Sequence, residues 1–292
     1  MTPEHTRLFP QILKPRRFFL PLAILAVALT LGSAVFAQRF GRSRRAMRTE
    51  QPPAWANAQG FEKDVFTFVR IQYSSAGYRG RGGGWDTDWP DAELNLSYRL
   101  QQMTSMKVDP QGKVLTIGDP ELFRYPFIYI VEPGGLTFED SEVPILRRYL
   151  LNGGFLMIDD FWGDDEWENL EAELRRVFPD RKIVDLPRTH PIFHSVFDIP
   201  NELNLQLPSL GWASDVRDGV TWETNKRYDT DTNAHFRAIL DDKGRICVMI
   251  CHNTDNGDGW EREGENQFYF REFSEKKAYP LGINIIFYAM TH

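Results

Sequence analysis

Two adjacent carboxylates, Asp159 and Asp160, are the chemical groups that stand out in this chain of 292 residues. They directly follow the apolar run 154–158, which has the composition of a buried β-strand. Two close carboxylates can bind a divalent metal ion, or one of them can keep a raised pKa and act as a general acid or base. Asp160 and Asp159 are therefore candidate catalytic residues. The alternative is that both side chains only cap the following turn and helix.

A second apolar run, 127–131, ends in the turn 132–135. One helical segment separates the two runs, so we expect them to form neighbouring parallel strands. Ligands of open α/β sheets bind at the carboxyl ends of the strands, which is where both turns lie. Gly134, Gly135 and Trp162 are therefore predicted to contact a ligand.

Two histidines, His190 and His194, flank Pro191 and lie four residues apart. On a helix, two histidines at this spacing can bind zinc. Here Pro191 disfavours a helix that begins at His190, and the glutamate that follows the first histidine in the zinc motif is absent. A second interpretation places one histidine beside Asp160 as a catalytic base. The simplest interpretation is a histidine that forms hydrogen bonds within its own loop. We name both histidines as catalytic candidates and assign no residue as a metal ligand.

The oxygen-rich segment 253–259 follows another apolar strand and is expected at the same edge of the sheet. Asn253 and Asp255 are predicted to bind a ligand there. Calcium binding by this segment, or by 229–233, is an alternative, although neither has the glycine spacing of an EF-hand and turn formation explains both. We predict no resident cofactor, with a divalent metal ion as the alternative.

A glycine-rich loop, 77–85, precedes a predicted helix and contains Arg79 and Trp85. Backbone amides at a helix N-terminus, together with Arg79, can hold an anion, and Trp85 can stack on a sugar ring. The loop has neither the Gly-Lys-Ser/Thr ending of a Walker A motif nor a regular dinucleotide-binding pattern. The alternative is a loop without a ligand.

Strand and helix patterns alternate through the second part of the chain. Predicted strands cover 65–73, 127–131, 154–158, 181–185, 238–240 and 245–251, and predicted helices cover 88–100, 139–151, 164–178 and 276–291. A short strand pair or turn is expected at 107–118. This alternation predicts a three-layer α/β/α domain around a mostly parallel sheet, over residues 61–292.

Composition and cysteine spacing restrict the functional class. The chain is 42% hydrophobic and 26% charged, as in ordinary globular domains, and its net charge of −7 argues against a nucleic-acid partner. Cys247 and Cys251 lie four residues apart on a predicted strand, a span of roughly 13 Å. A disulfide needs Cα atoms within about 7 Å, so both are expected to be buried free thiols.

The N-terminal segment 1–37 has the pattern of an export signal. Basic residues precede the apolar run 18–37, which ends in Val-Phe-Ala, and small residues at these positions suit signal peptidase. The alternative is an uncleaved transmembrane anchor, because the run is long enough to span a bilayer. We predict an exported domain, periplasmic or anchored in the inner membrane and facing outward, after a disordered linker at 38–60. A cytoplasmic domain on a reversed anchor is the remaining alternative, because basic residues flank the run on both sides.

Three segments carry a family likeness. The turn 159–161, the segment 190–194 and the loop 253–255 together resemble the bacterial family known as domain of unknown function 4159, over about residues 65–290. The order of strand, Gly-Gly turn, helix and strand is similar to the class I glutamine amidotransferase-like fold, which has a flavodoxin-like architecture. That fold places a nucleophilic cysteine at the sharp turn after the second strand, where this chain has Asp159 and Asp160. The resemblance therefore implies the fold, and the departure argues against thiol-dependent amide hydrolysis.

Two functions are compatible with these observations. The first is a non-thiol binding module of the cell envelope, whose partner is a glycan, a peptide or another envelope protein. Such a module touches the membrane through its N-terminal segment if that segment stays uncleaved. The second is a hydrolase of carbohydrate-like substrates that uses carboxylates and a histidine, with or without a metal. The hydrolase requires Asp160 and one histidine to converge in a single pocket.

Overall fold

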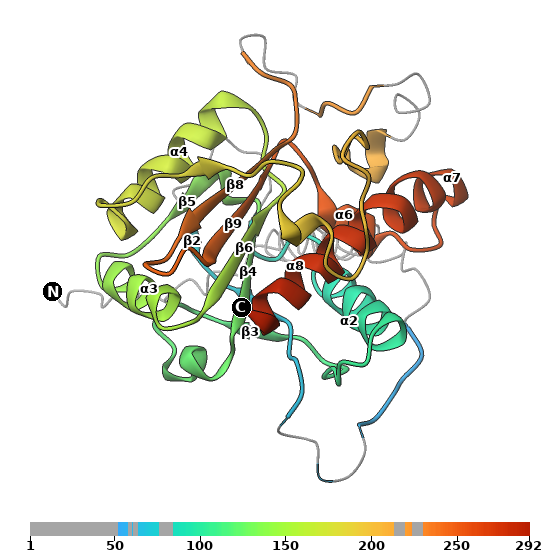
Figure 1. The fold of residues 1–292 in the computed structure, drawn as a ribbon, viewed down its shortest axis with the longest axis horizontal. Helices are drawn as coiled ribbons and strands as arrows, with labels where there is room; N and C mark the ends of the chain where they lie inside the picture. The colour runs from blue at the N-terminus through green and yellow to red at the C-terminus, as the bar shows by residue number, and fades with distance from the viewer. Residues whose placement is uncertain (1–51, 58–59, 61–63, 76–83, 213–219, 224–229) are drawn as a thin grey trace, which may run out of the picture. The chain divides into compact units, whose positions relative to one another are not determined.

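A computed structural model describes residues 52–57, 60, 64–75, 84–212, 220–223 and 230–292. Within the compact unit Thr49–His292, these residues form one large sheet flanked by helices (Figure 1). Its seven strands lie in the order β3 (Lys113–Leu115), β1 (Val69–Ile71), β4 (Phe127–Val131), β6 (Phe155–Asp159), β9 (Ile246–His252), β8 (His235–Leu240) and β7 (Val184–Asp185). The first five strands are parallel, and β8 runs antiparallel to both of its neighbours. The prediction of a mostly parallel α/β fold is confirmed.

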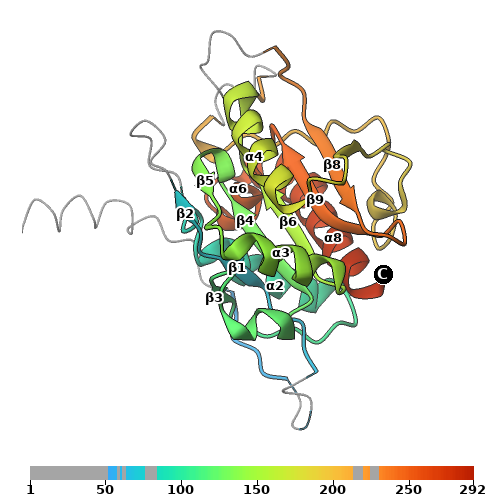
Figure 2. The ribbon, with the colours of Figure 1, turned by 90° about the vertical axis from the view of Figure 1, so that its left-hand side faces the viewer.

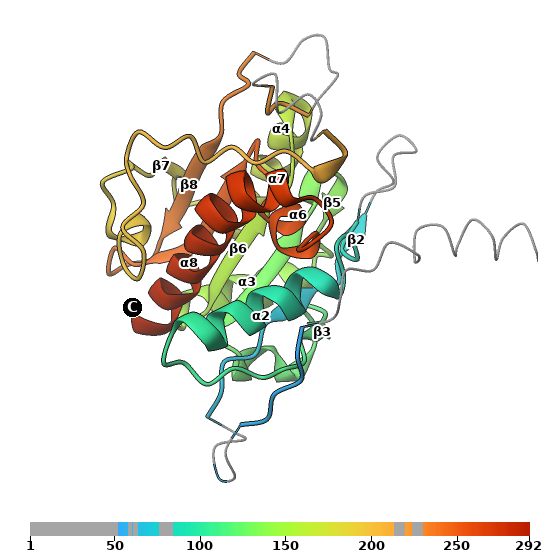
Figure 3. The same cartoon turned by 90° about the vertical axis from the view of Figure 1, so that its right-hand side faces the viewer.

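Helices cover both faces of the sheet. Figure 2 shows α3 (Glu142–Leu151) and α4 (Gly163–Val177) on one face. Figure 3 shows the opposite face, covered by α2 (Asp91–Met103), α6 (Asn256–Glu261), α7 (Gln267–Tyr269) and α8 (Tyr279–Thr291). A π-helical segment, η5 (Phe270–Ala278), leads directly into α8. The remaining short elements are β2 (Ser74–Ser75), β5 (Leu136–Thr137), η1 (Pro120–Arg124), η2 (Pro133–Gly135), η3 (Pro191–Phe193) and η4 (Leu210–Trp212).

The pleat of the strands divides the core into two layers. In β4, Phe127 and Tyr129 pack in the cluster beneath α2 and α8, whereas Ile128 and Ile130 pack in the cluster beneath α3 and α4. Successive side chains of a strand point to opposite faces, so a strand covered on both faces must be apolar throughout. This is why the central strands are continuous apolar runs in the sequence.

Most predicted elements lie close to their expected positions. The hairpin of β8 and β9 forms across Asp241–Gly244, and Cys247 and Cys251 are buried free thiols, as expected. The expected strand pair at 107–118 is instead the single strand β3, which pairs in parallel with β1. The final helical segment begins before the predicted start at 276, because Asn266 caps α7 at Gln267 and α7 continues directly into η5 and α8.

The predicted signal or anchor segment, 1–37, and most of the predicted linker lie outside the described residues. Among the residues that the structure describes, no helix combines the length and the apolar character needed to cross a bilayer.

The carboxyl ends of β4, β6 and β9 meet at one edge of the sheet and are joined there by backbone hydrogen bonds. The amide of Glu132, after β4, donates to the carbonyl of Asp159 at 3.1 Å. The amide of Asp160, after β6, donates to the carbonyl of Thr254 at 3.2 Å, and the amide of Asn253 donates to the carbonyl of Phe161 at 2.9 Å. These bonds hold the turns after three strands side by side, and this edge positions the candidate site.

Candidate functional site

A cavity of about 400 Å³ opens at this edge of the sheet. Of the residues that the structure describes, seven carboxylate side chains line it, together with Trp162, Gly134, Gly135 and a single basic residue, Arg262. The carboxylates belong to Asp88, Glu132, Asp160, Glu166, Glu223, Asp255 and Asp258. The cavity therefore carries a strong excess of negative charge if its carboxyl groups ionise.

Asp160 faces the cavity and is 8% exposed. Its backbone is left-handed, with φ of 55°, which turns the chain sharply after β6. One carboxylate oxygen, Oδ1, accepts a hydrogen bond from the indole of Trp162 at 3.1 Å. Burial, followed by the nearby negative charge of Glu132, raises the pKa of Asp160 well above its usual value.

Asp159 points away from Asp160 and has a structural role. Its Oδ2 accepts from the amides of Asn256 at 2.9 Å and Gly257 at 3.1 Å, and from the hydroxyl of Tyr129 at 3.2 Å. The side-chain amide of Asn256 donates to Oδ1 at 2.7 Å. Burial raises the pKa of Asp159 to about 7. The side chain thus holds the first turn of α6 against the sheet, and it is absent from the cavity lining.

Asp255 reaches the cavity from the N-terminus of α6. It is 3% exposed, and its Oδ1 accepts from the amide of Asp258 at 2.7 Å, which caps the helix. Burial raises its pKa well above the usual value, and the charge of Asp160 adds to the effect.

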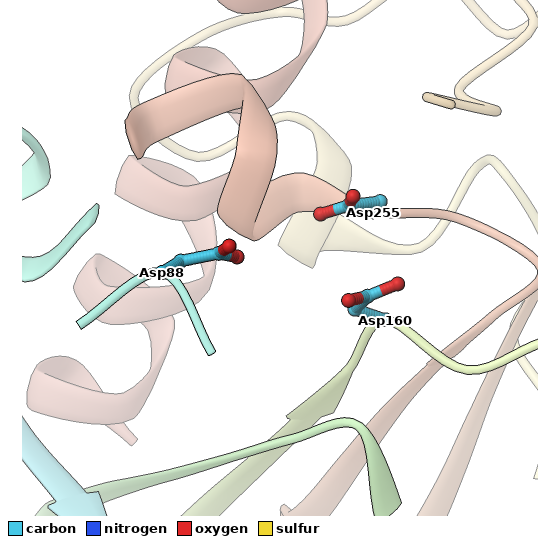
Figure 4. A group of neighbouring side chains, drawn as sticks. All are labelled: Asp88, Asp160 and Asp255. Atoms are coloured by element: carbon cyan, nitrogen blue, oxygen red, sulfur yellow. The ribbon is translucent and has the colours of Figure 1, made fainter. Parts of the chain in front are cut away.

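Asp88 is the third carboxylate at this point, and the sequence placed it only at the start of the predicted helix 88–100. Carboxylate oxygens of Asp88, Asp160 and Asp255 all lie within 4.8 Å of one another (Figure 4). The Oδ2 of Asp88 is buried and accepts no hydrogen bond among the described residues. Gly257 leaves room for it, because a Cβ on that glycine would lie 2.3 Å from this oxygen. The sequence contains no signal for this convergence except an acidic residue at the end of a glycine-rich loop.

Glu132 and Glu223 were also missed by sequence analysis. Burial raises the pKa of Glu132 to about 7, partly offset by a hydrogen bond from Thr87, and Glu166 adds to the rise. Burial likewise raises the pKa of Glu223 to about 8. Glu132 also has a left-handed backbone, with φ of 47°. Residues in this region of backbone space cluster at functional sites in proteins.

The predicted ligand-binding residues divide into lining and supporting positions. Gly134, Gly135, Trp162 and Asp255 line the cavity, whereas Asn253 is buried behind it. The side-chain oxygen of Asn253 accepts from the amide of Gly163 at 2.9 Å, so Asn253 fixes the start of α4. Trp162 packs edge-to-face against Trp222, with ring centroids 5.6 Å apart, and forms the aromatic side of the cavity.

Neither candidate histidine lies in the cavity. His190 caps η3 through Nδ1 and its ring lies 5.9 Å from that of Tyr288, whose hydroxyl bonds to the first residue of β9. This position is at the opposite edge of the sheet. His194 bonds to the carboxylate of Asp198 at 2.6 Å and to a backbone carbonyl at 2.8 Å. The expected convergence of a histidine with Asp160 is therefore not found, and among the described residues no group with metal-ligand geometry contains a histidine.

The glycine-rich loop contains two of the predicted ligand-binding residues, Trp85 and Arg79. Trp85 is half-buried against the core cluster beneath α3 and α4, outside the cavity lining, and its carbonyl accepts from Arg70 at 3.0 Å. Arg79 lies outside the described residues.

Neither thiol lines the cavity, although Cys251 lies on β9 beside the end of β6. Cys247 and Cys251 are fully buried on β9, and burial raises the pKa of Cys247 to about 11. A buried, protonated thiol is a poor nucleophile. That this chain performs no thiol-dependent amide hydrolysis stays a prediction.

Comparison with known proteins gives one family. Residues 67–290 match the model of the family described as Domain of unknown function (DUF4159), and no curated protein matches the chain. The match does not extend to the amidotransferase-like superfamily, which stays an expectation from the order of elements. Because the matched residues make up most of the chain and include all three carboxylates of Figure 4, this protein belongs to the family described as Domain of unknown function (DUF4159).

Proposed function

We propose that this domain is a non-thiol binding module of the bacterial cell envelope, and that the acidic cavity holds a positively charged group of its ligand. The observation that carries this proposal is the lining of the cavity, where, among the described residues, seven carboxylates face a single arginine. Amino-bearing glycans and cationic peptides have the matching chemistry, because an ammonium group donates several hydrogen bonds and carboxylates accept them.

Electrostatics supports a cationic ligand over an anionic one. Burial and mutual repulsion raise the pKa values of Asp160, Glu132 and Glu223, so an empty cavity ionises at a cost. A bound cation removes part of that cost, whereas a phosphate or sulfate group increases it. The net charge of −7 acts in the same direction against nucleic acid.

The envelope location rests on the sequence of the N-terminal segment. The apolar run 18–37 after several basic residues supports export, with the folded domain periplasmic or anchored on the outer side of the inner membrane. Trp162, which lines the cavity and packs against Trp222, supplies an aromatic side chain beside the carboxylates that suits a sugar ring or an aliphatic side chain.

A carboxylate-dependent hydrolase is the second candidate, now without a histidine. It is favoured by Glu132, whose pKa of about 7 suits a general acid at neutral pH and which lines the same cavity as Asp160. In that function Glu132 donates a proton to a leaving group, while an ionised carboxylate opposite stabilises positive charge or activates water.

Ligand titration of the full chain tests the binding function. We would measure thermal stability with amino-sugar oligomers, neutral oligosaccharides and a cationic peptide, in chelator so that metal ions are excluded. A ligand at a hundred times its Kd adds about 2.7 kcal/mol of stability. The expected result is stabilisation by an amino-bearing compound in the wild type and its loss in Asp160→Asn.

The matched control is Asp140→Asn, because the side chain of Asp140 is fully exposed and pairs with Arg176 at the surface. This control should respond as the wild type does. A wild type that ignores every cationic compound, or an Asp160→Asn variant that responds normally, would refute a cationic ligand in this cavity. Release of reducing sugar from an oligomer, lost in Glu132→Gln, would favour the hydrolase.

A further inference from the structure

We propose that Asp88, Asp160 and Asp255 form the binding site of one hard divalent cation, Ca²⁺ or Mg²⁺. This inference rests on the proposed binding function and assigns part of the cavity to a metal ion. The three side chains come from different parts of the chain: the loop before α2, the turn after β6 and the N-terminus of α6 (Figure 4). They converge on one point because the carboxyl ends of β6 and β9 are adjacent in the sheet.

The spacing of the oxygens fits a single ion. Ca²⁺ binds oxygen at about 2.3–2.6 Å, so two ligands of one ion lie at most about 5 Å apart. One carboxylate oxygen from each of the three aspartates lies within 4.8 Å of the other two. Figure 4 shows the three carboxylates pointing toward a common space. This separation of the oxygens is within the span of two ligands of one Ca²⁺ ion, whereas Mg²⁺ binds oxygen at about 2.0–2.1 Å and needs the oxygens closer together.

An unpartnered buried oxygen is the second, independent observation. Oδ2 of Asp88 is completely buried and accepts no hydrogen bond among the described residues. Buried carboxylate oxygens are otherwise almost always hydrogen-bonded or bound to a cation. Asp160 and Asp255 are more than nine-tenths buried, and each uses only Oδ1 in the hydrogen bonds found within the described part of the chain. Each of the three residues thus keeps an oxygen for a ligand.

The group of Asp88, Asp160 and Asp255 differs from the neighbouring acidic cluster in its ion pairs. Asp88, Asp258 and Glu261 form a second cluster, but Arg262 already pairs with Asp258 at 3.4 Å and with Glu261 at 2.5 Å. No arginine or lysine within the described residues forms an ion pair with Asp88, Asp160 or Asp255. The charge of buried Arg70 also acts on Asp88, but Arg70 is ion-paired with Glu93. Among the described residues, Asp160 and Asp255 therefore have no ion-paired cation.

Direct metal titration of the full chain tests this assignment. After treatment with chelator and its removal, the wild type would be titrated with Ca²⁺, Mg²⁺ and Zn²⁺ by calorimetry, and with Tb³⁺ by luminescence excited through tryptophan. We expect one Ca²⁺ or Mg²⁺ per chain, Tb³⁺ luminescence that Ca²⁺ displaces, and weak binding of Zn²⁺ because no histidine or thiol is present in the cluster. A wild type that binds neither Ca²⁺ nor Mg²⁺ overturns the assignment.

Variants locate the ion. Asp88→Asn and Asp255→Asn should each weaken the affinity by about tenfold or more, because each removes one charged ligand while keeping a similar side-chain shape. Asp255→Asn retains a helix-capping oxygen, and thermal melting would verify that each variant folds. Glu261→Gln in the neighbouring cluster and exposed Asp140→Asn are the controls and should bind as the wild type does. Normal affinity in both aspartate variants, or loss only in Glu261→Gln, would place the ion elsewhere.

The two proposals fail in different ways. If amino-bearing ligands bind in chelator but no divalent ion binds, the metal site is refuted and the binding module stands. If divalent ions bind and organic cations do not, the metal site stands and the ligand class proposed for the module is refuted.

Discussion

At the residue scale, the pair Asp159 and Asp160 shows how strand geometry separates two identical side chains. Neighbouring residues of a strand face opposite ways, and the left-handed backbone of Asp160 sharpens the division. Asp159 accepts four hydrogen bonds from buried donors, and Asp160 accepts one and faces the cavity. Adjacent carboxylates in a sequence therefore have different positions here, one bonded inside the core and one facing the cavity.

Replacement of Asp159 should affect stability far more than replacement of a surface carboxylate. Asp159→Ala leaves the amides of Asn256 and Gly257 and the hydroxyl of Tyr129 without their acceptor. We expect the free energy of unfolding to fall by about 2–4 kcal/mol, since buried unsatisfied donors are costly. Urea denaturation measures this, with Asp140→Ala as the control. A loss equal to that of the control would contradict the role assigned to Asp159.

His252 should make the domain less stable in acid. It stacks between Phe161 and Trp167, and burial, together with the charge of Arg237, lowers its pKa to about 3. The unfolded chain has the ordinary value of about 6.5 and so binds a proton more readily than the folded chain between the two values. Stability attributable to His252 is therefore complete above about pH 6.5 and is lost as the pH falls toward 3.

The measurement is urea denaturation of the wild type and of His252→Gln between pH 4 and 8. The difference in unfolding free energy between the two proteins should shrink as the pH falls, because only the wild type is penalised by protonation. A difference that stays constant with pH would mean that His252 is not held neutral. Comparison of the two proteins cancels the titration of the cavity carboxylates, which is common to both.

At the scale of elements, three turns at the carboxyl ends of β4, β6 and β9 support one another. Asn253 is the link between two of them, because it accepts from the amide of Gly163 at 2.9 Å and donates to the carbonyl of Asn233 at 2.8 Å. Its backbone is left-handed, with φ of 58°. Asparagine tolerates this conformation better than most residues, so the residue type matches both its backbone and its contacts.

Asn253 contributes to stability through its side-chain hydrogen bonds and through its tolerance of a positive φ. Two substitutions separate these contributions. Both Asn253→Ala and Asn253→Gly remove the side-chain hydrogen bonds, but only alanine is strained at positive φ. We expect both variants to be less stable than the wild type, with the glycine variant more stable than the alanine variant by about 1 kcal/mol. Chemical denaturation provides the comparison. Equal stability of the two variants would show that backbone strain is not important at this turn.

At the scale of the whole molecule, the carboxylates, His190 and the thiols lie in three different parts of the sheet: its two edges and its interior. Carboxylates gather at the carboxyl edge, His190 lies near the opposite edge, and both thiols are inside the sheet layer. A mostly parallel sheet produces this separation, because the turns that follow its central strands all emerge on one side. An amidotransferase-like nucleophile would have to be at the same edge as the carboxylates.

Thiol reactivity tests this separation in the native protein. Cys247 and Cys251 are inaccessible, and burial raises the pKa of both thiols. We expect neither thiol to react with a thiol-specific chromogenic reagent at pH 8 until the chain is unfolded in urea, when both should react. Rapid labelling of the folded protein would contradict their placement. The Cys251→Ala variant should bind ligands in the cavity as the wild type does.

The sequence by itself determined the class of fold, because continuous apolar runs are required in strands that are covered on both faces, and the helices between them leave only a parallel arrangement. It also placed Asp160, Gly134, Gly135, Trp162 and Asp255 at one edge of the sheet, since turns after parallel strands share an edge. The absence of a cysteine from the turn after β6 could equally be read from the sequence.

Only the tertiary structure decided which side chains meet. Asp88, Glu223 and Asp258 belong to loops and helix starts far apart in the chain, and their approach depends on strand order and helix packing rather than on any local pattern. The histidines show the converse, because His190 and His194 fit a catalytic pattern in sequence but their loop packs away from the cavity. Local sequence sets the conformation of a turn, whereas the distance between two turns is set by the whole core.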